Sequence, residues 1–108
     1  MEPDVTVVAL SGRMVIGTEL QRIEPMVDDL LKKQEKKIIF DLAKVDFVDS
    51  SGLGVLVSCV SKAKKAGGQL RFVGISDRVM KLLKITHLDS TLSIDASREA
   101  ACAALGKA

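Results

Sequence analysis

The stretch that organises this chain is Val45-Asp46-Phe47-Val48-Asp49-Ser50-Ser51-Gly52-Leu53-Gly54-Val55-Leu56. An apolar, β-branched run at 38–40 precedes it and is typical of a buried strand. A run at 53–66 follows it, with apolar residues at helical spacing. Two carboxylates, two serines and two glycines therefore lie at a strand-to-helix turn. In an open α/β sheet, ligands and partners usually dock in the crevice beyond the strand ends.

Strand-like and helix-like segments alternate along the rest of the chain. Such alternation implies crossover connections and an α/β fold with a mostly parallel or mixed sheet. We expect about four to five strands and about four helices in a single domain over residues 1–108. Strands are expected at 5–10, 37–42, 70–73 and 91–94, and helices are expected to begin near Glu24, Ser51, Ser76 and Ser97.

Several local features refine this expectation. Ser11-Gly12 is a turn signal, after which 13–16 is either a continuation of the strand or its hairpin partner. Thr18 is a candidate helix cap, and Pro25 fits the first turn of the helix that follows. The helix after Ser50 should bury one stripe and turn another outward. The buried stripe comprises Leu53, Leu56, Val57, Val60 and Ala63; the outward one comprises Val55, Ser58 and Lys62, with Cys59 at the border.

Composition narrows the classes of function. The chain has 108 residues and a net charge of +2, and it has no Trp or Tyr, which disfavours binding to nucleic acid. No apolar run approaches the roughly 20 residues of a membrane span, so no direct membrane insertion is expected. The acidic start at 1–4 does not resemble a secretory signal. Cys59 and Cys102 have no metal-ligand spacing, which favours buried, reduced thiols in a cytoplasmic protein.

The sequence lacks the residue combinations that the common catalytic sites require. His87 is the only histidine and nothing places it beside Ser50, so a catalytic triad is disfavoured. The chain has neither a phosphate-binding loop nor a full dinucleotide fingerprint. Asp41, Asp46 and Asp49 superficially suggest a phosphoryl-accepting receiver, but no acidic pair follows the first strand to hold Mg²⁺. We therefore predict no catalytic residue, no metal and no cofactor.

Ser50 has two interpretations. A serine at a helix start is usually an N-cap, which contributes about 1 kcal/mol by accepting a hydrogen bond from an unpaired N–H. The alternative is that Ser50 is a phosphorylation site beside an accessible apolar surface that includes Val55. A phosphate adds about −1.5 to −2 charges, and the start of a helix accommodates an anion. The phosphorylated protein should then stay folded, and the phosphate should weaken the binding of a partner that docks there.

The segment Phe47 to Leu56 resembles the signature of STAS domains, specifically of bacterial anti-sigma factor antagonists. The similarity extends to 10–14, 38–42, 67–70 and 79–83. The resemblance implies a small, mostly parallel sheet with helices packed mainly on one face. It also implies phosphorylation of Ser50, or of Ser51 as the fallback site, by an anti-sigma factor serine kinase that the unphosphorylated form binds. A metal-dependent serine phosphatase would reverse the modification.

By position, the resemblance assigns Asp49, Ser51, Gly52 and Leu53 to the contact with the kinase, and the outward face adds Val55 and Ser58. The chain departs from the family in lacking a clear edge strand before Val5 and in having Val15 where many members have Asp. Two other functions remain open. One is a scaffold or transporter-associated STAS subunit that is never phosphorylated, and the other is a small enzyme that handles nucleotides or phosphate.

Overall fold

The computed structural model describes residues 5–15, 17 and 20–106 and contains one parallel sheet with helices. The strand order is β1-β2-β3-β4, and every neighbouring pair is parallel. The expected α/β class is therefore confirmed. The elements are β1 (Val5–Met14), the short 3-10 helix η1 (Leu20–Arg22), α1 (Ile23–Lys32), β2 (Lys37–Val48), α2 (Ser50–Lys65), β3 (Gln69–Val73), α3 (Asp77–Ile85), β4 (Ser93–Ile94) and α4 (Arg98–Gly106).

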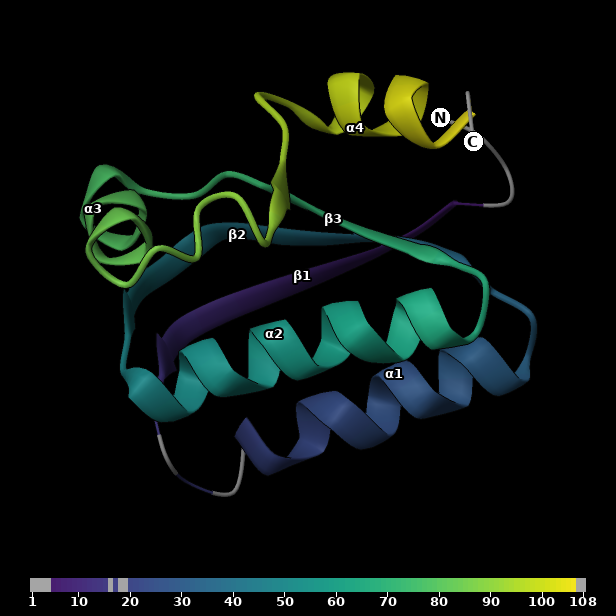
Figure 1. The fold of residues 1–108 in the computed structure, drawn as a ribbon, viewed down its shortest axis with the longest axis horizontal. Coiled ribbons are helices and arrows are strands. Elements are labelled where there is room, and N and C mark those ends of the chain that lie inside the picture. Colours follow the sequence, from purple (N-terminus) through teal and green to yellow (C-terminus); the bar gives the residue numbers. More distant parts are fainter. Residues whose placement is uncertain (1–4, 16, 18–19, 107–108) are drawn as a thin grey trace.

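The helices cover the two faces of the sheet unequally. Figure 1 shows α1 and α2 side by side on one face and α4 on the other. The larger core joins the sheet to α1, α2 and α3. The smaller core lies beneath α4 and consists of Ile39, Val73, Ala101, Cys102 and Leu105. Arg98 of α4 also pairs with Asp41 of β2 at 2.7 Å, which fixes the helix to the sheet.

β2 is the central strand because it is buried on both faces. Ile38, Ile39 and Phe40 are all fully buried, as the continuous apolar run predicts for a strand covered on both sides. Phe40 and its β3 neighbour Phe72 pack edge to face, with ring centroids 5.7 Å apart. This pairing favours the quadrupoles of both rings and anchors the strand that leads to the Ser50 turn.

Two bulges make β2 longer than β1. Between Ala9 and Ser11, and again between Gly12 and Arg13, the register shifts so that β2 has an extra residue each time. Ser11 and Gly12 lie within β1, so the turn expected there was wrong. Continuation to Met14 was the correct alternative to a hairpin. The sequence signal was misleading because Gly12, with φ of +82°, supports a bent strand.

The side chain of Asp41 holds the first bulge. Its Oδ1 accepts a hydrogen bond from the backbone N–H of Ala43 at 2.9 Å. This bond lowers the pKa of Asp41, burial opposes the shift, and Arg98 lowers it further. Asp41 thus has a structural role in this strand, separate from the carboxylates nearer Ser50.

The helices agree with most of the expected positions. Pro25 lies in the first turn of α1, and Ser76 Oγ caps α3 by accepting from Val79 N at 3.2 Å. Thr18 and the segment 1–4 lie outside the described residues. In α2, Cys59 is fully buried and Val57 is only half-buried, so the stripe is rotated from the predicted one. Burial raises the pKa of the Cys59 thiol to about 12, which keeps it protonated and unreactive.

Candidate functional site

Asp49, and not Ser50, is the N-cap of α2. Asp49 has extended backbone angles, and its Oδ1 accepts a hydrogen bond from Gly52 N at 2.8 Å. Its carbonyl accepts from Leu53 N at 3.0 Å, and its own N–H donates to the carbonyl of Met14 at 3.1 Å. One residue therefore starts the helix and ties it to the end of β1. The N-cap interpretation of Ser50 was wrong because the preceding aspartate occupies that position.

Gly52 allows this close approach. A Cβ at Gly52 would lie 2.3 Å from the Met14 carbonyl oxygen and 2.8 Å from Val48 Cγ1. No side chain other than hydrogen fits there without movement of the β1 backbone. The glycine therefore fixes the distance between the first turn of α2 and the ends of both strands, and so it fixes the position of the turn.

Ser50 is the first residue of α2 and is exposed. Within the described residues, no hydrogen bond uses its hydroxyl. The first N–H groups of a helix lack intrahelical partners, and the Asp49 side chain accepts a hydrogen bond from that of Gly52. The backbone N–H groups of Ser50 and Ser51 donate to no described residue at the helix start. An anion on Ser50 would meet the positive end of the helix dipole, beside the capping carboxylate of Asp49.

Some of the other predicted contact residues reach the surface of the protein, and the rest are buried beneath it. Ser51, Val55 and Ser58 are half-buried on α2. Ser51 and Val55 line a hollow of about 320 Å³ whose other described lining residues are Gly17, Leu20, Gln21 and Glu24. Val55 also packs against the core, so the expectation that it projects outward is only partly met. Gly52 and Leu53 are buried, so their side chains support the turn from below.

Gly54 differs from Gly52, although only one residue separates them. It is exposed, and a Cβ added there would have no atom within 4 Å. Glycine inside a helix costs roughly 0.5–1 kcal/mol relative to alanine. Since packing within the described residues does not require it, Gly54 leaves an open surface between Ser50 and Val55 on the outer side of the helix.

Comparison with known proteins shows the family of this chain. The family model described as "STAS domain" matches residues 2–101. The chain belongs to the STAS domain family. It is similar to the anti-sigma-B factor antagonist of Bacillus subtilis, with 36% identity over 69 residues, which is 64% of this chain and 63% of that protein. The match thus spans less than two thirds of that relative's length.

Solved STAS structures share the fold. The chain aligns with a crystal structure described as "a putative anti-sigma factor antagonist" from Thermotoga maritima with a TM-score of 0.87 and 24% identity, covering 98% of this chain and 91% of that one. A sulfate transporter family protein from Wolinella succinogenes aligns with a TM-score of 0.78 and 22% identity, covering 99% and 91%. The STAS fold therefore occurs in both kinds of protein, and the fold alone does not choose between them.

Sequence reasoning missed one contact near the turn of this STAS domain. The Arg13 guanidinium lies 5.1 Å from the centroid of the Phe47 ring, in a cation–π arrangement. The pair lies near the ends of β1 and β2, and only the bulged register brings the two residues opposite each other. In the described part of the chain, no group of three His, Cys, Asp or Glu side chains is placed to bind a metal ion. Nor does that part contain a helix with the length and apolarity needed to cross a membrane.

Proposed function

We propose that this protein is an anti-sigma factor antagonist whose binding to an anti-sigma factor serine kinase is controlled by phosphorylation of Ser50. The unphosphorylated form binds the kinase in the cytoplasm. The phosphorylated form releases it, and a metal-dependent serine phosphatase restores binding. The observation that carries this proposal is the exposed Ser50 hydroxyl, which does not serve as the helix cap because Asp49 does.

The first turn of α2 suits a phosphate without refolding. The N–H groups of Ser50 and Ser51, which donate to no described residue, and the dipole of a 16-residue helix both favour an anion at this end. Lys62, Lys64 and Lys65 complement the dipole at the other end. The phosphate need displace no buried group, because Ser50 is exposed. The modified and unmodified proteins should therefore share one fold.

The same phosphate would oppose docking. Asp49 already places a carboxylate next to Ser50, and Glu24 lines the neighbouring hollow. An added charge of about −1.5 to −2 makes this surface strongly negative, and a partner that covers it must desolvate that charge. Burying an unpaired charge is costly, so the change in affinity should be large although the fold is unchanged.

The proposed contact surface is the outer side of the first turns of α2. It comprises Ser50, Ser51, Gly54, Val55 and Ser58, and the buried Gly52 and Leu53 hold it in place. Ser51 is less exposed than Ser50, which is why Ser50 remains the preferred site and Ser51 the fallback site.

Gly54→Ala should change the stability of the fold and the affinity for the kinase in opposite directions. The fold should gain about 0.5–1 kcal/mol, because alanine favours the helix and the added Cβ meets nothing. The affinity for the kinase should fall, because the methyl group stands on the surface that the partner approaches. Thermal denaturation and a binding titration on the same preparation test both statements. An unchanged affinity would remove Gly54 from the contact.

The direct test is incubation with the cognate kinase and ATP. Wild type should incorporate phosphate, Ser51→Ala should do so as well, and Ser50→Ala should not. Both variants replace a hydroxyl on the same helical turn, so they form a matched pair. Label that persists on Ser50→Ala and disappears on Ser51→Ala would move the switch by one residue. Binding without any label on wild type would favour the unmodified scaffold function instead.

A further inference from the structure

β1 lies at one edge of the sheet that the described residues form. It pairs with β2 on one side, and no other described strand pairs with it on the opposite side. Alternate residues of such a strand direct their N–H and C=O groups outward, and these form a template for another strand. β1 is ten residues long, which is longer than the short edges that usually limit pairing.

β1 also lacks the features that protect edges. The run Val5–Gly12 has no charge and no proline, and Arg13 is the only charged residue of the strand. The two bulges insert their extra residues into β2, so β1 itself contains no inserted residue. Natural edges are usually blunted by lysines, prolines or bulges in the edge strand. In the described part of the chain, the edge is therefore unprotected by charge or proline over Val5–Leu10, before the bend at Gly12.

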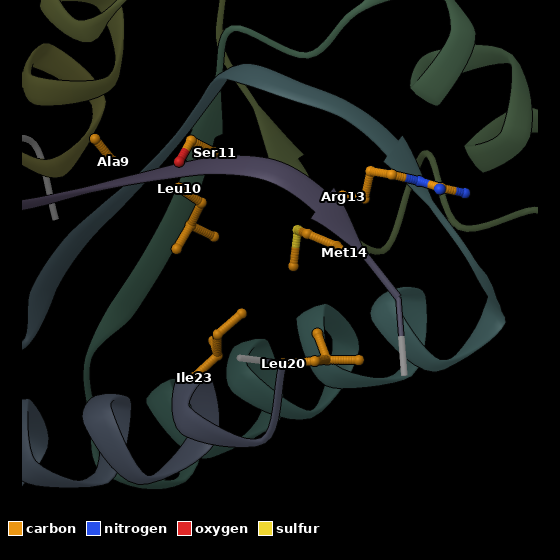
Figure 2. A pocket seen from close by; sticks show the side chains of 7 residues that line it. All are labelled: Ala9, Leu10, Ser11, Arg13, Met14, Leu20 and Ile23. Atoms are coloured by element: carbon orange, nitrogen blue, oxygen red, sulfur yellow. The ribbon is translucent and has the colours of Figure 1, made fainter. Parts of the chain in front are cut away.

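A hollow lies beside the second half of this edge. Figure 2 shows Leu10 and Met14 pointing from β1 toward Leu20 and Ile23, while Ala9 and Ser11 lie on the other side of the strand. The hollow has a volume of about 220 Å³. Its lining is mixed, with Ser11 and Arg13 beside Leu10, Met14, Leu20 and Ile23, and it would accept side chains from a strand added to β1, in the manner of β-augmentation.

We propose that two copies of this chain pair antiparallel through β1, about a two-fold axis near Ala9. An uncharged strand does not repel its own copy. The antiparallel arrangement places each Arg13 opposite Val5 of the other copy, so the two positive charges lie at opposite ends of the paired segment. Residues opposite each other share a face of the sheet, so Val8 of one copy would lie beside Leu10 of the other and cover the hollow.

This pairing does not use the helix that carries the switch. Ser50 is on α2, whereas the dimer interface would involve β1 and the hollow beside α1. A dimer formed in this way would keep both Ser50 hydroxyls accessible. The oligomeric state and the phosphorylation of Ser50 can therefore succeed or fail separately.

A charge exchange at the two-fold axis tests the proposal. Ala9 is exposed, so Ala9→Lys and Ala9→Glu should each fold, and each should be monomeric because like charges would meet at the axis. A mixture of equal amounts should restore the dimer. Sedimentation over roughly a thousandfold range of concentration should show the mass of wild type doubling. Ala103→Lys, at an exposed position of α4, is the matched control and should behave as wild type.

Three results in the sedimentation experiments would overturn the proposal. They are a wild-type protein that stays monomeric over the whole range, an Ala9→Lys variant that still dimerises, and a Lys–Glu mixture that stays monomeric. Hydrogen exchange adds a local readout. Amides of Val5–Ala9 should become more protected from exchange as the protein concentration rises. Unchanged protection there in a dimeric sample would place the dimer interface elsewhere.

Discussion

Gly52→Ala is expected to lower the midpoint of thermal unfolding by roughly 10–20 °C. The added Cβ would lie 2.3 Å from the Met14 carbonyl oxygen, and this atom belongs to backbone that β1 holds in place. Overpacking of this kind typically costs about 1–3 kcal/mol and sometimes more. We expect the upper end of that range, and about 4–8 °C is lost per kcal/mol in a domain of this size. Thermal denaturation followed by circular dichroism measures the shift.

Gly54→Ala is the control for helix propensity. Both substitutions add one methyl group to the same helix, two residues apart, and both replace glycine by a better helix former. Only the first creates a clash. The two variants should therefore shift the midpoint in opposite directions. If both raise it, the close approach of α2 to Met14 is not a constraint on this fold, and the account of the turn fails.

Ser50→Asp is expected to weaken kinase binding by about 10- to 100-fold, which corresponds to about 1.4–2.8 kcal/mol. The midpoint of unfolding should stay the same or rise slightly, because a carboxylate in the first turn interacts favourably with the helix dipole by about 0.3–1 kcal/mol. The loss should arise from a second negative charge beside Asp49 on the proposed contact surface. Isothermal titration with the purified kinase measures the affinity.

Ser50→Asn separates the effect of charge on binding from the effect of side-chain size. The asparagine side chain has nearly the shape of aspartate but is neutral, so this variant should bind far better than Ser50→Asp. Raising the salt concentration should narrow the difference, because screening weakens repulsion between exposed charges. Equal losses in both variants would mean that steric fit, and not charge, controls the contact at this position.

The sequence predicted the main elements because their signals are local. The continuous apolar run of β2 and the cap of α3 by Ser76 are each set by a few neighbouring residues. The expected helix after the polar turn is present, and it begins at Ser50, one residue before the predicted Ser51. β4 is shorter than the predicted 91–94, since only Ser93–Ile94 pair with β3.

The features that were missed depend on contacts between distant segments. The bulges in β2 arise from how β1 and β2 align, and the capping role of Asp49 depends on where the helix meets Met14. Adjacent Asp and Ser are both good N-caps, so propensity alone does not choose between them. The rotation of α2 that buries Cys59 likewise follows from how the helix packs on the sheet.

A phosphate on Ser50 should abolish docking of the kinase while the fold stays the same. The most direct measurement compares the phosphorylated and unphosphorylated forms of the wild-type protein in one experiment, with a kinase titration and a thermal denaturation of each. We predict a large loss of affinity, greater than that of Ser50→Asp, with midpoints of unfolding that agree within a few degrees. Equal affinities, or a phosphorylated form that unfolds far earlier, would contradict the account.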